Sequence, residues 1–301
     1  MSIIRHREGR HGRFFYNVND TYIGRSMHLY GEWSEAEVHL FSQIVRPGDV
    51  VLEAGSNIGT HTVPLSRLAG DTGCVHAFEP QDHIHQLLCA NLISNGCTNT
   101  RVYQSAVGAT DGFTDMMEAD IHHPNNFGGV SLLYRDGFAM RMVPLRTIDS
   151  LKLDRLDFLK ADVEGFEFEM LSGCAQTLQR CRPVVFVESV GPGGDGRARL
   201  RDYFLSQGYQ CWHYITPLFN PQNFGAWPHD EFTGICSIDM LRFQNAGYTQ
   251  IGLHQLVDCA VFSRQSFLRQ FLAGIPKRVH CGQCSCPARG LFWTCWLTTN
   301  R

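Results

Sequence analysis

Acidic residues follow several short apolar stretches of this 301-residue chain, each at a point where a strand is predicted to end. Because the carboxyl ends of parallel strands meet at one edge of a sheet, we expect these carboxylates to lie close together. Carboxylates that lie this close repel one another unless cations or hydrogen-bond donors stabilise them. The residues are Glu53, Glu79, Asp162, Glu164 and Glu188.

A glycine-containing turn lies at the first of these strand ends, in the stretch Glu53-Ala54-Gly55-Ser56-Asn57-Ile58-Gly59. Gly55 permits a tight turn in which a ligand approaches the backbone, and Gly59 permits close packing of a helix on the strand. Counting from Gly55, Asn57 and Thr60 stand where a dinucleotide-binding G-x-G-x-x-G motif has its second and third glycines. The turn is therefore less suited to binding a pyrophosphate.

The two strand-end acids at positions 53 and 79 indicate the class of cofactor. The Glu79 carboxylate is placed to accept hydrogen bonds from ribose hydroxyls. The Glu53 carboxylate repels a phosphate but pairs with an ammonium or approaches a sulfonium. These charges favour S-adenosylmethionine (SAM) over a dinucleotide. Two alternatives stay open, a nicotinamide-dependent oxidoreductase and a non-catalytic Rossmann-like binding module.

The second motif, Leu159-Lys160-Ala161-Asp162-Val163-Glu164-Gly165, also joins a predicted strand to a predicted helix. We expect Asp162, Glu164 and Glu188 to form the catalytic side of the site. Asp162 is the first candidate for a general base and Glu188 the second, and a divalent cation held by these two is an alternative role. Other candidate bases are the histidines His213, His229 and His254.

The alternation of short apolar stretches with helical ones predicts an α/β fold with a doubly wound, mostly parallel sheet and an antiparallel edge. We expect an N-terminal arm and cap helix over residues 1–45, with Ser34 and Glu37 as its capping box. Residues 46–265 form the main domain, with a loop insertion at 108–142 as a lid over a substrate. Predicted helices include residues 58–69 and 166–178.

Composition excludes some classes of protein. Hydrophobic residues make up 44% and charged residues 18%, which argues against extended disorder. The net charge is −3 and the pI about 6.5, so bulk charge does not favour a nucleic-acid partner. No stretch reaches the roughly 20 apolar residues of a membrane span, and the start of the sequence lacks the apolar region of a signal peptide. We therefore expect a cytoplasmic protein.

The stretch 266–301 is rich in cysteine. Its Cys281-Gly282-Gln283-Cys284 spacing resembles half of a zinc site, which Cys286, Cys295 or His280 would complete. The absence of a second C-x-x-C favours a reduced terminal extension over bound zinc.

The motifs together resemble the FkbM-type SAM-dependent methyltransferases. The matching text is Tyr30-Gly31-Glu32-Trp33, the stretch Leu52–Gly59, Ala77-Phe78-Glu79-Pro80, Leu145-Arg146-Thr147-Ile148-Asp149 and Leu159–Glu167. The resemblance implies a class I methyltransferase (Rossmann-like) fold and methyl transfer to a hydroxyl of a sugar or a natural-product-like small molecule.

The resemblance also implies roles for individual residues. Glu53, Gly55, Asn57 and Gly59 would hold the methionine end of SAM, and Glu79 its ribose. Asp162 and Glu164 would face the site of transfer. The expected cofactor contacts further include Tyr30, Glu32, Pro80, Gln104, Ser105 and Asp162. The pair Glu53-Ala54 departs from the family, which usually has Asp followed by an aliphatic residue, and Ser56 replaces a usual Ala.

Overall fold

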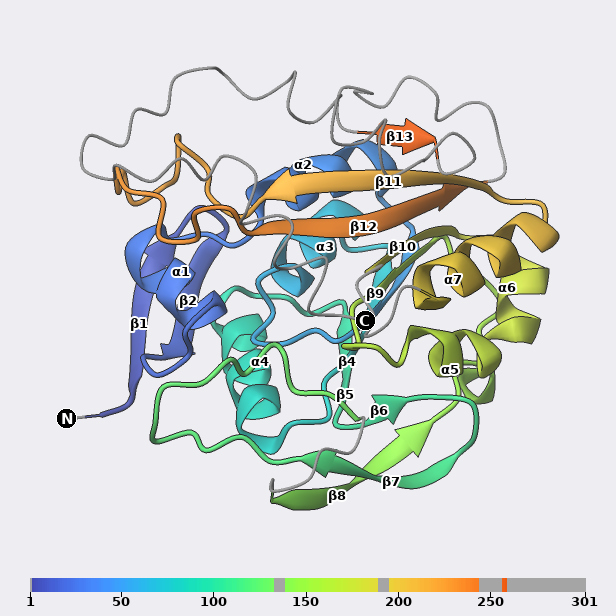
Figure 1. Ribbon diagram of the computed structural model, residues 1–301, viewed down its shortest axis with the longest axis horizontal. Coiled ribbons are helices and arrows are strands. Elements are labelled where there is room, and N and C mark those ends of the chain that lie inside the picture. Colours follow the sequence, from blue (N-terminus) through green and yellow to red (C-terminus); the bar gives the residue numbers. More distant parts are fainter. Residues whose placement is uncertain (1, 133–138, 189–194, 244–255, 259–301) are drawn as a thin grey trace.

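The computed structural model describes residues 2–132, 139–188, 195–243 and 256–258. Within them, an eight-stranded sheet in the order β13-β11-β12-β10-β9-β3-β4-β5 runs through the molecule (Figure 1). Its strands are β3 (Val50–Ala54), β4 (Cys74–Phe78), β5 (Thr100–Tyr103), β9 (Phe158–Ala161), β10 (Val184–Glu188), β11 (Gln210–Pro217), β12 (Cys236–Phe243) and β13 (Leu256–Asp258).

The strand directions confirm the predicted fold class. Strands β3, β4, β5, β9 and β10 are parallel, and β12 runs antiparallel to both β10 and β11. The chain leaves β3 toward β4 and β5 and then returns to β9 on the other side of β3. This reversal is the topological switch point at which doubly wound sheets bind their ligands.

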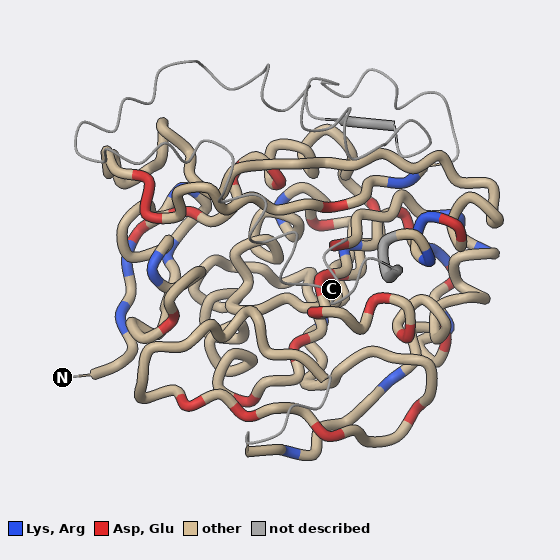
Figure 2. Tube along the Cα trace, in the orientation of Figure 1, with Lys and Arg blue, Asp and Glu red and all other residues tan. Residues whose placement is uncertain are grey.

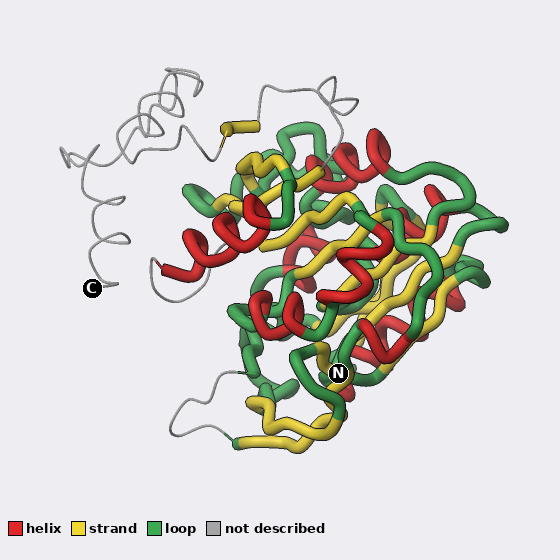
Figure 3. The backbone as a smooth tube through the Cα atoms, turned by 90° about the vertical axis from the view of Figure 1, so that its right-hand side faces the viewer, coloured by secondary structure: helices red, strands yellow, loops and turns green. Residues whose placement is uncertain are grey.

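Helices cover both faces of the sheet (Figure 3). On one face Val51 packs with residues of α2 (Glu35–Ile44) and α3 (Thr62–Ala69), and Ala77 packs with α4 (Asp82–Ser94). On the other face Leu52 packs with residues of α5 (Glu167–Ser172), α6 (Ala175–Cys181) and α7 (Asp195–Ser206). Because both faces are covered, the central strands are apolar on both sides.

Three predicted helical features need correction. The helix predicted over 58–69 begins only at Thr62, after the turn of the glycine motif. The helix predicted over 166–178 divides into α5 and α6 at Gly173, where a side chain would lie 1.9 Å from the Gly108 carbonyl oxygen. Ser34 is the N-cap of α2, but its hydroxyl donates to the Glu37 carboxylate and accepts no hydrogen bond from a backbone N–H group of the helix, so the predicted capping box is wrong.

The N-terminal arm is a β-hairpin, β1 (Ile4–Gly9) with β2 (Gly12–Asn17), followed by α1 (Ile23–Leu29). Phe14 and Tyr16 of β2 are buried against apolar residues of α4. Arg5 and Arg7 of β1 lie opposite Tyr16 and Phe14 in the hairpin, and the Arg7 side chain donates a hydrogen bond to the Met27 carbonyl of α1.

The insertion at 108–142 contains strands rather than loop alone. Strands β6 (Ala106–Val107), β7 (Gly112–Met117) and β8 (Met140–Arg146) form a second, three-stranded sheet, and a short 3₁₀ helix, η1 (Asp149–Leu151), follows. The segment after β7 is attached to the rest of the chain, because the Thr21 N–H donates to the Asn125 carbonyl and the Gln81 side chain donates to the Phe127 carbonyl. Its predicted role as a lid stays a prediction.

Some predictions concern residues outside the described ones. These are His254 and the cysteines of the proposed zinc site, Cys281, Cys284, Cys286 and Cys295, so both roles stay predictions. Among the described residues, the helices are all too short or too polar to cross a bilayer.

Candidate active site

A cavity of about 230 Å³ lies beside the switch point, at the carboxyl ends of β3, β4, β9 and β10. Figure 2 shows acidic residues gathered near the centre of the molecule, where these strands end. The residues that line the cavity include most of the predicted site: Glu53, Gly55, Asn57, Glu79, Pro80, Ser105, Asp162, Glu164 and Glu188. The predicted residues outside this lining are Tyr30, Glu32, Gly59 and Gln104.

Glu79, directly after β4, is held by two backbone groups. Its Oε2 accepts the Asn57 N–H at 3.0 Å and its Oε1 accepts the Gln81 N–H at 2.9 Å. The residue is 3% exposed, and burial raises the pKa of its carboxyl to about 7 against the partial opposition of these hydrogen bonds. Each carboxyl oxygen keeps acceptor capacity on its cavity side, which suits a vicinal diol.

In the turn after β3, Gly55 allows a close contact with another loop of the same chain. Gly55 has φ +80°, and a side chain there would lie 1.9 Å from the Asp162 carbonyl oxygen, so the turns after β3 and β9 are in direct backbone contact. Asn57 has φ 48°, in the left-handed region that glycine or asparagine adopts most readily. Asparagine is therefore compatible with the backbone conformation at this position.

Glu53 and Lys160 are neighbours on β3 and β9, on the face covered by α2 and α3. The Glu53 Oε2 atom accepts a hydrogen bond of 2.6 Å from the Thr62 hydroxyl, whereas its buried Oε1 has no hydrogen-bond partner among the described residues. The Lys160 Nζ atom is 3.7 Å from Oε1. Burial raises the pKa of Glu53, and the Lys160 charge opposes that rise.

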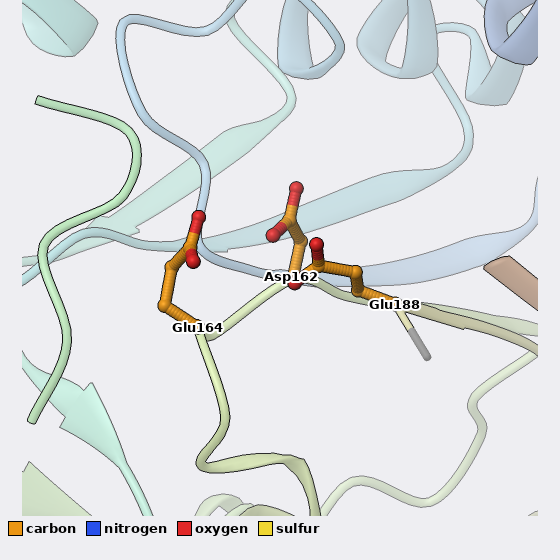
Figure 4. A group of neighbouring side chains, drawn as sticks. All are labelled: Asp162, Glu164 and Glu188. Atoms are coloured by element: carbon orange, nitrogen blue, oxygen red, sulfur yellow. The ribbon is translucent and has the colours of Figure 1, made fainter. Parts of the chain in front are cut away.

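Asp162, Glu164 and Glu188 form a second group of carboxyls (Figure 4), the first two in the loop after β9 and the third at the end of β10. One oxygen of each lies within 4.8 Å of the others. The Asp162 side chain is 44% exposed, whereas Glu188 Oε2 is buried and accepts no hydrogen bond from the described residues. Burial, followed by the charges of Asp162 and Glu164, raises the pKa of Glu188 well above its usual range.

The loop that carries this second group is held in an unusual conformation. Glu164 has φ 53°, which costs a residue with a side chain roughly 1–2 kcal/mol. The Glu167 carboxylate accepts the Gly165 N–H at 3.1 Å, and the Ser131 hydroxyl donates to the Glu164 carbonyl at 2.7 Å. These bonds hold the backbone of the loop on both sides of the Glu164–Gly165 peptide, and the last of them connects the loop to the 108–142 insertion.

Packing accounts for the predicted residues outside the cavity lining. The Glu32 carboxylate accepts hydrogen bonds from Arg10, Asn220 and the Phe224 N–H, and the Tyr30 hydroxyl accepts the Glu231 N–H, so both fix the segment after β11. The Gln104 side chain donates to Asp82, and a side chain at Gly59 would lie 2.8 Å from Leu88 of α4. Their contact with a cofactor stays a prediction. The alternative bases His213 and His229 also lie outside the lining.

Sequence reasoning missed several charged or polar residues of the cavity. Glu37 of α2 and His61, before α3, are both nearly fully buried, and their side chains approach to 3.7 Å. Burial raises the pKa of Glu37 to about 7 and lowers that of His61 well below its usual value. The signal for Lys160 was a charged residue inside the apolar strand 158–161. Glu37 gave no such signal, because its position depends on how α2 packs.

Comparison with models of protein families gives one match for this chain. The model of the methyltransferase FkbM domain matches residues 53–211, more than half of the chain. The chain belongs to the FkbM methyltransferase family. A comparison with curated proteins finds no match.

Solved structures resemble this FkbM protein only distantly. Methyltransferase FkbM from Methylobacillus flagellatus KT is 16% identical with a TM-score of 0.43, over 69% of this chain and 51% of that one. A SAM-dependent methyltransferase from Aquifex aeolicus is 13% identical with a TM-score of 0.38, over 75% and 95%. TYW2 from M. jannaschii in complex with AdoMet is 13% identical with a TM-score of 0.42, over 81% and 88%. The chain thus spans about half the length of the Methylobacillus protein.

Proposed function

We propose that this FkbM-family protein is a SAM-dependent methyltransferase that methylates a hydroxyl of a sugar or a natural-product-like small molecule. One observation carries the proposal. A single cavity at the switch point has the two strand-end acids Glu53 and Glu79 on one side and the carboxyls of Asp162, Glu164 and Glu188 on the other. We call the first the cofactor side, which also includes Asn57, and the second the acceptor side.

The cofactor side fits the chemistry of SAM. Glu79 presents acceptor oxygens for ribose hydroxyls, and the Glu53 Oε1 atom, which accepts no hydrogen bond from the described residues, offers a buried negative charge to the ammonium of the methionine part. When bound, SAM supplies an electrophilic methyl group on a sulfonium whose sulfur leaves as a neutral thioether. The turn after β3 and the acids of this side hold and orient the donor, which is the main catalytic task in such a displacement.

The acceptor side fits deprotonation of a hydroxyl. Of the three acids of the acceptor side, Asp162 has the most exposed side chain. Its backbone contacts the turn after β3 on the cofactor side. We infer that its carboxylate accepts the hydroxyl proton as the acceptor oxygen forms its bond to the methyl carbon and the carbon–sulfur bond breaks. Glu164 and Glu188 would bind neighbouring donor groups of the acceptor.

Calorimetry with S-adenosylhomocysteine, the demethylated product, tests the cofactor side directly. We expect saturable binding, and its absence would contradict the proposal. Incubation with labelled SAM and a panel of sugars and hydroxylated natural products tests transfer. Binding without any methylated product across the panel would favour the non-catalytic module, and binding of a nicotinamide dinucleotide in place of SAM would favour the oxidoreductase.

The metal role of Asp162 and Glu188 stays a prediction. Together with Glu164 they offer three carboxyl oxygens, the donor type that Mg²⁺ and Mn²⁺ prefer. Treatment with EDTA followed by return of Mg²⁺ or Mn²⁺ tests it. Methyl transfer that stops and then recovers would assign a cation to these residues, whereas unchanged transfer would remove the cation from the reaction.

A further inference from the structure

Lys160 is the one lysine or arginine among the described residues that line the cavity. Its side chain is 3% exposed, and its Nζ atom lies 3.7 Å from Glu53 Oε1 and 3.6 Å from Asp162 Oδ2. The ammonium therefore lies between an acid of the cofactor side and an acid of the acceptor side. None of the roles assigned above uses this lysine.

The charge of Glu53 depends on this neighbour. A buried carboxylate is costly unless an opposite charge or a hydrogen bond stabilises it. The Thr62 hydroxyl stabilises one Glu53 oxygen, and the Lys160 ammonium is the cation nearest to the other. Burial raises the pKa of both Glu53 and Glu37, and Lys160 is the strongest influence that lowers it in each case.

Lys160 itself remains a cation. Burial alone lowers the pKa of its ammonium, but the carboxylates of Asp162, Glu53, Glu37 and Asp239 together raise it above its usual value. A lysine that stays protonated accepts no proton from an acceptor hydroxyl, which excludes it as the general base. Its contribution is a fixed positive charge.

We propose that Lys160 is a positioning residue that keeps Glu53 ionised beneath the methionine part of the cofactor. The proposal rests on the proposed function, because it requires the cofactor's ammonium to bind near Glu53. An ionised Glu53 attracts that ammonium, whereas a protonated Glu53 offers it only a neutral oxygen. Loss of Lys160 therefore acts on cofactor binding through the protonation of a different residue.

Calorimetric titration of S-adenosylhomocysteine from pH 6.0 to 8.5 tests this proposal. We expect Lys160→Met to weaken S-adenosylhomocysteine binding at least about tenfold at pH 6.5. The difference in affinity from the unmodified protein should become smaller at higher pH, because Glu53 ionises again there. Lys160→Arg, which keeps the charge, should recover most of the affinity. Lys152→Met makes the same change at an exposed site after η1 and should leave affinity unchanged at every pH.

A second comparison applies even if Lys160→Met alone fails to fold. In a Glu53→Gln background the carboxyl that needs Lys160 is gone, so adding Lys160→Met should cost less than about threefold in affinity. The Glu53→Gln protein should keep only the pH dependence that comes from Glu79, whose carboxyl has a pKa of about 7. A loss of about tenfold or more on adding Lys160→Met to Glu53→Gln would show that Lys160 only fills space and would overturn the proposal. A loss in the single variant that does not depend on pH would overturn it as well.

The two proposals fail in different ways. If the unmodified protein binds no S-adenosylhomocysteine, the proposed function fails. If it binds the ligand and Lys160→Met binds equally well at every pH, only the role of Lys160 fails.

Discussion

Hydrogen bonds within the protein hold the acids of the cofactor side, whereas the acceptor side has an exposed Asp162 side chain and a Glu188 oxygen that accepts no hydrogen bond from the described residues. Glu79 accepts two backbone N–H groups and Glu53 accepts the Thr62 hydroxyl, so both are fixed before any ligand arrives. On the acceptor side Asp162 is 44% exposed, and Glu188 Oε2 accepts no hydrogen bond from the described residues. This difference fits the proposed roles, in which the first group holds the cofactor and the second binds the acceptor.

If the two sides have these separate roles, the largest effect is expected for Asp162→Asn. If the acceptor side performs proton transfer, methyl transfer should fall at least about 100-fold, because a general base contributes roughly 10²–10⁴-fold. The affinity for S-adenosylhomocysteine should stay within about threefold, since the cofactor side is intact. Steady-state transfer and calorimetry on one preparation measure the two quantities.

The matched control is Asp154→Asn, at an exposed position before β9, which should change neither quantity. Asp162→Asn protein that keeps its turnover would remove Asp162 from the mechanism. A large loss of cofactor affinity in the same variant would mean that the two sides do not act separately.

The second largest effect is expected for Glu79→Gln, on the cofactor side. Losing a charged acceptor for the ribose hydroxyls should weaken S-adenosylhomocysteine binding about 10- to 100-fold, the range for a hydrogen bond to a charged group. Turnover at saturating SAM should change much less. Comparison of 5′-methylthioadenosine with its 2′-deoxy analogue sharpens the test, because the penalty should shrink for the ligand that lacks the hydroxyl. An equal penalty for both would place the ribose elsewhere.

The cofactor side should also make stability depend on pH. The Glu79 carboxyl has a pKa of about 7 in the folded protein, raised by burial, and about 4.5 when exposed. Between these values the folded protein binds a proton that the unfolded chain has lost. The free energy of unfolding should therefore fall as pH rises from about 4.5 to 7, by on the order of 1 kcal/mol per pH unit.

Urea denaturation of the ligand-free protein at pH 5.0 and 7.5 measures this slope. Glu79→Gln should flatten it, and Glu37→Gln should do so as well, because the pKa of Glu37 is also raised to about 7 by burial. The control Glu118→Gln replaces an exposed acid and should leave the slope unchanged. A slope that is equal in all four proteins would contradict the buried, protonated state of Glu79.

The cofactor side was the easier of the two to predict from sequence. Its acids follow strands that are apolar on both faces, and the chain order alone places Glu53 and Glu79 at one sheet edge. Glu37 and Lys160 were missed as site residues, because their roles depend on the packing of α2 against the sheet and on pairing between strands. Tyr30 and Glu32 were assigned to the cofactor by resemblance, whereas their contacts show that they fix a distant segment.

The smallest effect concerns the loop of the acceptor side, where Glu164 has φ 53°. Glycine adopts this conformation freely, so Glu164→Gly should change stability by no more than about 1 kcal/mol, relief of strain being offset by a more flexible unfolded chain. It should nevertheless lower turnover about tenfold, because the carboxyl that faces the acceptor is lost and the loop is less fixed. Urea denaturation and steady-state transfer measure the two effects.

Arg182→Gly provides the matched control for that variant. Arg182 ends α6 with φ 52°, the same backbone conformation, but it is exposed and lies outside the cavity lining. The two glycine variants should therefore differ little in stability and clearly in turnover. If turnover falls equally in both, the effect is general loosening of the chain and Glu164 has no part in binding the acceptor. If it falls only in Glu164→Gly and Glu164→Gln reproduces the loss, the charge of that carboxyl, and not its backbone, is what the acceptor requires.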